Sequence, residues 1–194
     1  MSIHPSLHTL LPRLFLFSFF SSCILKTTSV NAQFSMNIIG AENNQELRQF
    51  VKQCFDILDL KESLHINLFL SRNLPAEYQG RTVKKENDCH GIAQFEIYLD
   101  DGLSGRRQRL VLAHELIHVK QYLTKRLAIT PEKVLWLGKK YHVNFDDLQR
   151  SPWESEAYLE DSQLVKKVVM REKKEKNSTL AVVRRNEAAL PSQQ

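Results

Sequence analysis

The chain has 194 residues, of which 42% are hydrophobic and 25% are charged, and its formal net charge is +5. This is the composition of one ordinary globular domain with a hydrophobic core, with no sign of a second domain or an internal repeat. Much of the basic excess lies in residues 166–176, where acids alternate with the bases and no aromatic side chains interleave for base stacking. A nucleic-acid partner is therefore not expected.

The first 32 residues predict a secretory signal peptide. Arg13 precedes the apolar run 14–25, and Val30-Asn31-Ala32 offers the small residues that signal peptidase recognises. The run is shorter than the ~20 residues that span a bilayer, which argues against an uncleaved anchor. Cleavage is expected after Ala32, giving a secreted or periplasmic protein with no stable membrane insertion. The alternative is a lipoprotein, lipidated on Cys23.

The following segment predicts one helix and two strands. A helix is expected from about residue 45 to 60, where apolar residues recur at helical spacing behind Asn43-Asn44. Strands are expected at 64–70 and 92–99, because apolar and polar residues alternate there. The polar stretch between the two strands, which contains residues 80–83, is interpreted as a connection.

Two cysteines remain after removal of the signal peptide. Cys54 lies on the expected N-terminal helix, and Cys89 precedes the second expected strand. In an oxidising compartment the two are expected to form a disulfide. The alternative is two separate thiols.

The segment 108–127 contains no Pro or Gly and is apolar around much of its circumference, which predicts a buried helix. It carries the motif H-E-x-x-H as His114, Glu115 and His118. On a helix the two histidines project from one face and can bind one Zn²⁺ at about 2.0–2.1 Å, with Glu115 beside the metal. Burial of these three side chains is costly unless something satisfies them, as a metal ion would. The alternative is a pair of satisfied core histidines.

A catalytic zinc site normally has a third protein ligand. Ser151-Pro152 predicts a helix start, and Glu154 and Glu156 follow it. The two carboxylates are about 200° apart around a helix, so both cannot face one metal. Glu154 shares its face with mostly apolar residues and is the predicted ligand, whereas Glu156 is expected in solvent. His142, on a β-hairpin expected at 133–143, is the alternative ligand.

The order of strand, turn and H-E-x-x-H helix resembles that of the zincin metallopeptidases. Glu154-Ser155-Glu156-Ala157 is similar to the Glu-x-x-Ala element of several glutamate-zincins, whose first glutamate binds zinc, and the resemblance covers about residues 92–165. The metzincin subclass is excluded, because Gln121 and Thr124 stand where that subclass has glycine and histidine. The resemblance implies an edge strand that pairs with an extended substrate, for which 64–70 and 92–99 are the candidates.

The expected fold is therefore a small α+β zincin-like domain at residues 33–176. An N-terminal helix and a short mixed sheet pack on the buried H-E-x-x-H helix, and a C-terminal helix carries the third ligand. Periodicity is lost after about Lys176, so residues 177–194 are expected to form a flexible tail.

The expected function is that of a monomeric zinc metallopeptidase acting on a peptide or protein substrate. Glu115 would be the general base for a zinc-bound water. Tyr158 and Tyr141 are candidate oxyanion stabilisers, and Gln121 is expected beside the zinc ligand His118. Two alternatives remain open. One is an inactive zincin-fold binding module whose structural zinc has a fourth protein ligand, and the other is a zinc amidase acting on cell-wall peptide.

Overall fold

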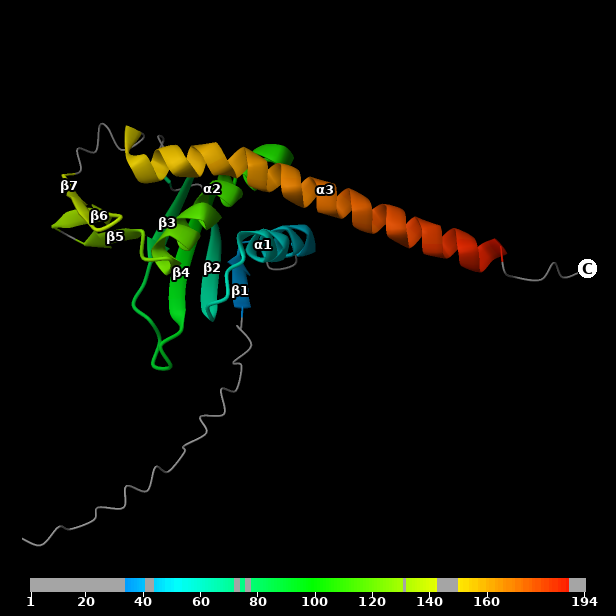
Figure 1. Cartoon of the computed structure of the whole chain (residues 1–194), viewed down its shortest axis with the longest axis horizontal. Helices are drawn as coiled ribbons and strands as arrows, with labels where there is room; N and C mark the ends of the chain where they lie inside the picture. Colours follow the sequence, from blue (N-terminus) through cyan, green and yellow to red (C-terminus); the bar gives the residue numbers. More distant parts are fainter. Residues whose placement is uncertain are drawn as a thin grey trace, which may run out of the picture. The chain divides into compact units, whose positions relative to one another are not determined.

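The structure is a computed structural model that describes residues 34–40, 44–71, 74–75, 78–130, 132–142 and 150–188, with side chains up to residue 181. The predicted signal peptide, Cys23 and the cleavage site lie outside these residues. The described elements are β1 (Phe34–Ile39), α1 (Gln45–Leu58), β2 (Leu64–Ser71), β3 (Gly80–Lys84), β4 (Ala93–Asp100), α2 (Gly105–Leu123), β5 (Leu127–Thr130), β6 (Lys133–Trp136), β7 (Lys139–Tyr141) and α3 (Pro152–Ala188). The predicted α+β class is confirmed (Figure 1).

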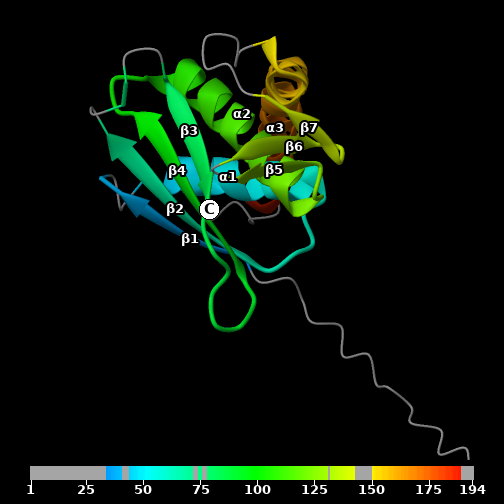
Figure 2. The same ribbon diagram turned by 90° about the vertical axis from the view of Figure 1, so that its left-hand side faces the viewer.

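Four strands form a mixed sheet in the order β1-β2-β4-β3 (Figure 2). β1, β2 and β4 are parallel, and β3 runs antiparallel to β4 at one edge. Both strands predicted from alternation are confirmed as β2 and β4, but they are the central strands. The expectation that one of them is an edge is wrong, because β1 and β3 occupy the two edges.

The stretch around residues 80–83, interpreted as a connection, is the edge strand β3. Its five residues alternate weakly, since Val83 is the only large apolar side chain among them. A short edge strand has one neighbour and half-covered faces, so it leaves little periodic pattern in the sequence. β1 was missed as well.

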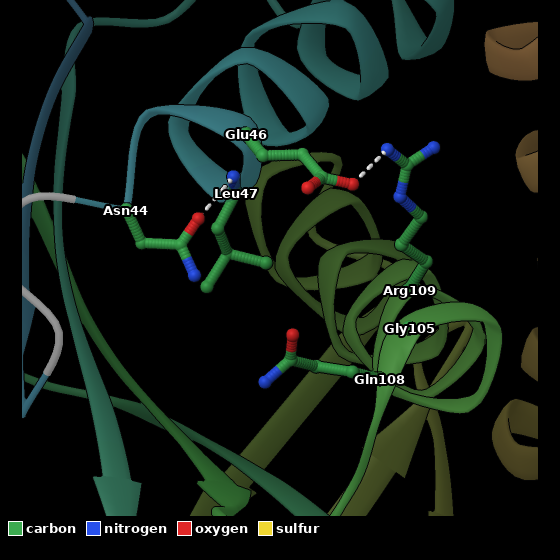
Figure 3. Close-up of a pocket in the computed structure, with 6 residues that line it drawn as sticks. All are labelled: Asn44, Glu46, Leu47, Gly105, Gln108 and Arg109. Carbon is green, nitrogen blue, oxygen red and sulfur yellow. Dashed lines mark hydrogen bonds and ion pairs between the residues drawn. The ribbon is translucent and has the colours of Figure 1, made fainter.

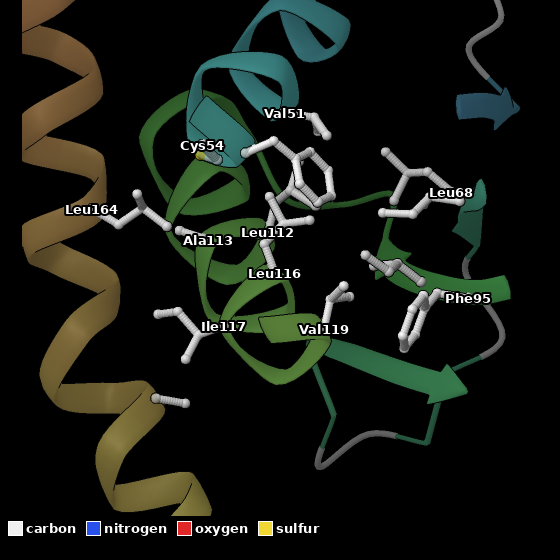
Figure 4. Packing of buried hydrophobic residues seen from close by; sticks show 14 of the residues in the cluster. Val51, Cys54, Leu68, Phe95, Leu112, Ala113, Leu116, Ile117, Val119 and Leu164 are labelled. Atoms are coloured by element: carbon white, nitrogen blue, oxygen red, sulfur yellow. The ribbon is translucent and has the colours of Figure 1, made fainter. Parts of the chain in front are cut away.

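α2 is buried because it lies between the sheet and α3 (Figures 1 and 4). In Figure 4, Ala113 and Ile117 point toward α3, while Val119 points toward Phe95 of the sheet. All four side chains are fully or almost fully buried, which confirms the predicted buried helix. α2 also packs on α1, β3 and β4, so the H-E-x-x-H motif is held from several directions.

α3 begins at Pro152, as predicted, but it does not end where periodicity is lost. The helix continues through residues 177–188, so the expected tail is wrong over that range, and 189–194 lie outside the described residues. Residues 173–181 are exposed, and no buried face imposes an apolar stripe on their sequence. The helix start differs in one detail. Ser151 Oγ, expected to cap it, has no hydrogen-bond partner among the described residues.

The predicted hairpin is confirmed as β6 and β7, and β5 adds a third antiparallel strand. Leu137 and Gly138 form its turn with φ angles of 50° and 77°, the left-handed conformation of a two-residue hairpin loop.

The predicted disulfide is not formed. Cys54 is on the buried face of α1, Cys89 is exposed in the turn before β4, and both thiols are free. None of the helices in the described part of the chain is long and apolar enough to cross a membrane.

Candidate metal centre

Three side chains from two helices converge on one point. His114 Nε2 lies 3.1 Å from Glu154 Oε2, His118 Nε2 lies 3.3 Å from Glu154 Oε1, and the two Nε2 atoms are 3.2 Å apart. In a tetrahedral zinc site with bonds of about 2.0–2.1 Å, neighbouring ligand atoms are about 3.3 Å apart. Each of the two Nε2 atoms is therefore spaced from the other, and from the Glu154 oxygen that it contacts, much as neighbouring ligand atoms are in such a site, and these residues could hold a metal ion.

The antiparallel packing of α2 against α3 creates this convergence. Residues four apart on α2 present both imidazoles on one face, and the first turn of α3 brings Glu154 against them. Both histidines are buried, and the Glu154 side chain keeps 20% of its surface exposed. The carboxylate is thus the member of the group that solvent reaches most easily.

The charges of the group depend on one another. Burial raises the pKa of Glu154, but hydrogen bonds from His114 and His118 outweigh it and lower that pKa to about 2. Burial lowers the pKa of His118, but the carboxylates of Glu154 and Glu115 outweigh it and raise that pKa to about 9. The carboxylates therefore favour positive charge at the His118 imidazole, and a divalent cation can supply that charge in place of a proton.

The second ring nitrogen of His114 lies outside the contacts with Glu154 and His118. This atom, Nδ1, is buried without a hydrogen-bond partner in the described structure, and the nearest acidic oxygen, Asp161 Oδ2, lies 3.6 Å away. Burial raises the pKa of Asp161. Asp161 stands seven residues, two turns, after Glu154, so helical spacing could have indicated it as a neighbour of the site.

Glu115 lies next to His114 on α2 and is buried against β3. Its Oε2 accepts a hydrogen bond from Thr82 Oγ1 at 2.7 Å, and burial raises the pKa of the carboxyl group. A Cβ on Gly80 would lie 2.7 Å from Glu115 Oε1 and 2.6 Å from Val111 Cγ1, so glycine is needed for this close approach. Thr82 and Gly80 were missed because β3 itself was missed.

The prediction for Glu156 is wrong. It is half-buried and binds Arg126 through both carboxylate oxygens, with one contact of 2.8 Å. Gln121 Nε2 donates to it at 3.2 Å, while Gln121 Oε1 lies 2.8 Å from His118 Nδ1. The expected place of Gln121 beside His118 is thereby confirmed.

Of the remaining residues predicted for the site, only Tyr158 lies beside the group that could hold a metal. The ring of Tyr158 lies 4.5 Å from the ring of His114 and is 54% exposed, so it borders the open side of the group. Tyr141 packs edge-on against Trp153, at 5.7 Å between ring centroids. His142 is exposed and is not part of the group that could hold a metal.

A separate pocket of about 100 Å³ lies at the N-terminal ends of α1 and α2 (Figure 3). In it Arg109 of α2 pairs with Glu46 of α1 at 2.6 Å, and Asn44 accepts from the Leu47 backbone as the N-cap of α1. Its lining residues include none of the metal-centre residues.

No family model, no curated protein and no solved structure matches this chain.

Proposed function

We propose that this chain is a zinc-dependent peptidase of the zincin type. The observation that carries the proposal is the convergence of His114 Nε2, His118 Nε2 and the Glu154 carboxylate, with Glu115 next to the first of them in the chain. Two imidazoles and one carboxylate form a ligand set used by catalytic zinc in peptidases, and three protein ligands leave a fourth position for water or substrate.

Zinc held there would lower the pKa of a water molecule and polarise the carbonyl of the scissile peptide bond. Glu115 takes the proton from the attacking water and returns it to the leaving amine. Thr82 holds one oxygen of Glu115 in place for this transfer. Burial, followed by the charge of Glu154, raises the pKa of Tyr158, which therefore stays protonated and can donate to the developing oxyanion.

The proposed substrate is an extended peptide. β3 ends the sheet, and none of the described strands pairs with its outer side. An exposed edge strand can add an extended peptide through backbone hydrogen bonds. Because Thr82 on β3 contacts Glu115, a peptide paired with this edge would run beside the proposed base.

The ligand count supports an enzyme over a structural zinc module. A closed structural site needs four protein ligands. Within the described residues the group has three members, and His142, the alternative ligand expected from the sequence, is exposed outside it. A zinc amidase acting on cell-wall peptide would use the same ligands and remains a prediction.

The test combines zinc content with cleavage. We expect elemental mass spectrometry to find one zinc per chain. We also expect the protein to cleave members of a broad peptide library that includes cell-wall muropeptides. Glu115→Gln should retain zinc and lose cleavage by about 10²–10⁴-fold, whereas Glu160→Gln, a surface control, should retain both. Stoichiometric zinc without cleavage would favour the binding module, and absence of zinc would overturn the proposal.

We also propose that the mature protein begins after Ala32 and acts outside the cytoplasm. N-terminal sequencing of the protein recovered from the periplasm or the medium tests this. Residue 33 at the N-terminus supports it, and a lipidated Cys23 would replace it with the lipoprotein alternative.

A further inference from the structure

Gln121 is a fully buried polar side chain placed between a metal ligand and an ion pair. Its exposed fraction is 0%, and it lies one turn after His118 on α2. Its Nε2 donates to the Trp153 backbone carbonyl at 3.0 Å and to Glu156 Oε1 at 3.2 Å. Its Oε1 lies 2.8 Å from His118 Nδ1.

These contacts leave one orientation for the amide group. The end of Gln121 that faces Trp153 and Glu156 meets two acceptors, so that end must be the NH₂ group. The carbonyl end then faces His118 and can only accept, which requires a proton on Nδ1. The proton on Nδ1 leaves Nε2 as the nitrogen that binds metal once its own proton is lost.

Arg126 fixes the carboxylate that orients Gln121. It binds both oxygens of Glu156, and its guanidinium lies 4.8 Å over the ring of Trp136 on β6. A two-point contact with a planar guanidinium holds a carboxylate in one orientation, which a single-point contact does not. The chain of contacts therefore runs from the hairpin through Arg126, Glu156 and Gln121 to His118.

We propose that the Arg126–Glu156 ion pair, acting through Gln121, positions His118 and thereby sets the affinity of the centre for zinc. Arg126, Glu156 and Gln121 are positioning residues, since His118 alone among these four is a ligand. The part that concerns zinc affinity rests on the proposed function. The part that concerns the Nδ1–H of His118 does not, because the hydrogen bonds are present in the protein alone.

The chain offers a matched control for this ion pair. Lys120 on α2 pairs with Glu160 on α3 at 3.0 Å, and Arg126, which follows the end of α2, pairs with Glu156 on α3. Both ion pairs therefore link the C-terminal end of α2, or the turn after it, to α3. In the described part of the chain neither side chain hydrogen-bonds to Gln121. Loss of Lys120 therefore removes an ion pair between the same regions and leaves the contacts of His118 intact.

The first measurement is zinc affinity, by competition with a chromogenic chelator, on the purified full chain. We expect Arg126→Met to weaken zinc binding about 10-fold and Gln121→Met between about 10- and 100-fold. Lys120→Met should bind zinc as the wild type does. Thermal unfolding of each metal-free variant establishes that it folds. Arg126→Lys keeps the positive charge but loses the two-point contact of the guanidinium, so its zinc affinity should fall between those of the wild type and Arg126→Met.

The second measurement uses the metal-free protein. The Nδ1–H proton of His118, protected by Gln121, should give a slowly exchanging resonance in ¹⁵N-edited spectra of the wild type and of Lys120→Met. That resonance should shift or exchange rapidly in Arg126→Met and Gln121→Met. An unchanged resonance in both variants, or zinc affinity equal to that of the wild type in both, would overturn the inference. If the wild type binds no zinc, the proposed function fails, and the resonance still decides whether these residues position His118.

Discussion

Glu154 and Glu156 have almost equal exposure, 20% and 19% of their side chains, yet their carboxylates meet different partners. Glu154 contacts the Nε2 atoms of His114 and His118, whereas Glu156 binds Arg126 and Gln121. Two residues along a helix correspond to about 200° of rotation. One carboxylate therefore faces the candidate metal centre, and the other faces Arg126 and Gln121. Direction, not burial, separates their roles.

The two glutamates should therefore respond differently to substitution. Glu154→Ala removes a ligand and should weaken zinc binding by more than about 100-fold, while Glu156→Gln weakens only the support of His118 and should cost about 10-fold. Chelator competition measures both. Equal losses, or a larger loss in Glu156→Gln, would contradict the assignment of Glu154.

Thr82 should matter for cleavage but not for zinc binding. Its hydroxyl donates to Glu115 Oε2 at 2.7 Å, so Thr82→Val, which has nearly the same shape, leaves the carboxylate without this donor. We expect kcat to fall about 10-fold, part of the 10²–10⁴-fold that a general base contributes, with unchanged zinc content. Thr82→Ser keeps a hydroxyl and should restore most of the rate. Equal rates for valine and serine would show that the hydrogen bond has no catalytic effect.

Gly80 should be needed for the packing of β3 on α2. A methyl group there would lie 2.6 Å from Val111 Cγ1 and 2.7 Å from Glu115 Oε1, closer than van der Waals contact allows. Gly80→Ala should therefore lower the free energy of unfolding by about 1–3 kcal/mol, as overpacking does, measured by urea denaturation. The control is Gly102→Ala, an exposed position where the nearest atom, a side-chain oxygen of Asp100, would lie 3.2 Å from the added Cβ. A similar loss in both variants would refute the packing argument.

The two described cysteines should differ in reactivity. Burial raises the pKa of the Cys54 thiol, which keeps it protonated as well as inaccessible, whereas Cys89 is exposed. Iodoacetamide at pH 8 should label Cys89 in the native protein and Cys54 only after unfolding, as read by peptide mapping. A cross-linked Cys54–Cys89 peptide in an unreduced digest would contradict the structure.

Much of the scaffold was predictable where an element buries one side. Alternation located β2 and β4, and helical spacing located α1 and α2, because a buried face requires apolar residues at a fixed period. Elements without a fully buried face leave no such period, which explains why β1, β3 and the end of α3 were not predicted. β1 and β3 lie at sheet edges, and the described side chains of α3 at residues 173–181 are exposed.

The sequence by itself indicated the three residues that could hold a metal ion and the glutamate beside them. His114, Glu115 and His118 are related by local helix geometry, and Glu154 was separated from Glu156 by the faces of one helix. Only the tertiary structure decided what supports them. Thr82 reaches Glu115 through the pairing of β3 with β4, and Arg126 reaches His118 through Glu156 and Gln121. Such contacts join residues about 30 positions apart along the chain, and no local period in the sequence records them.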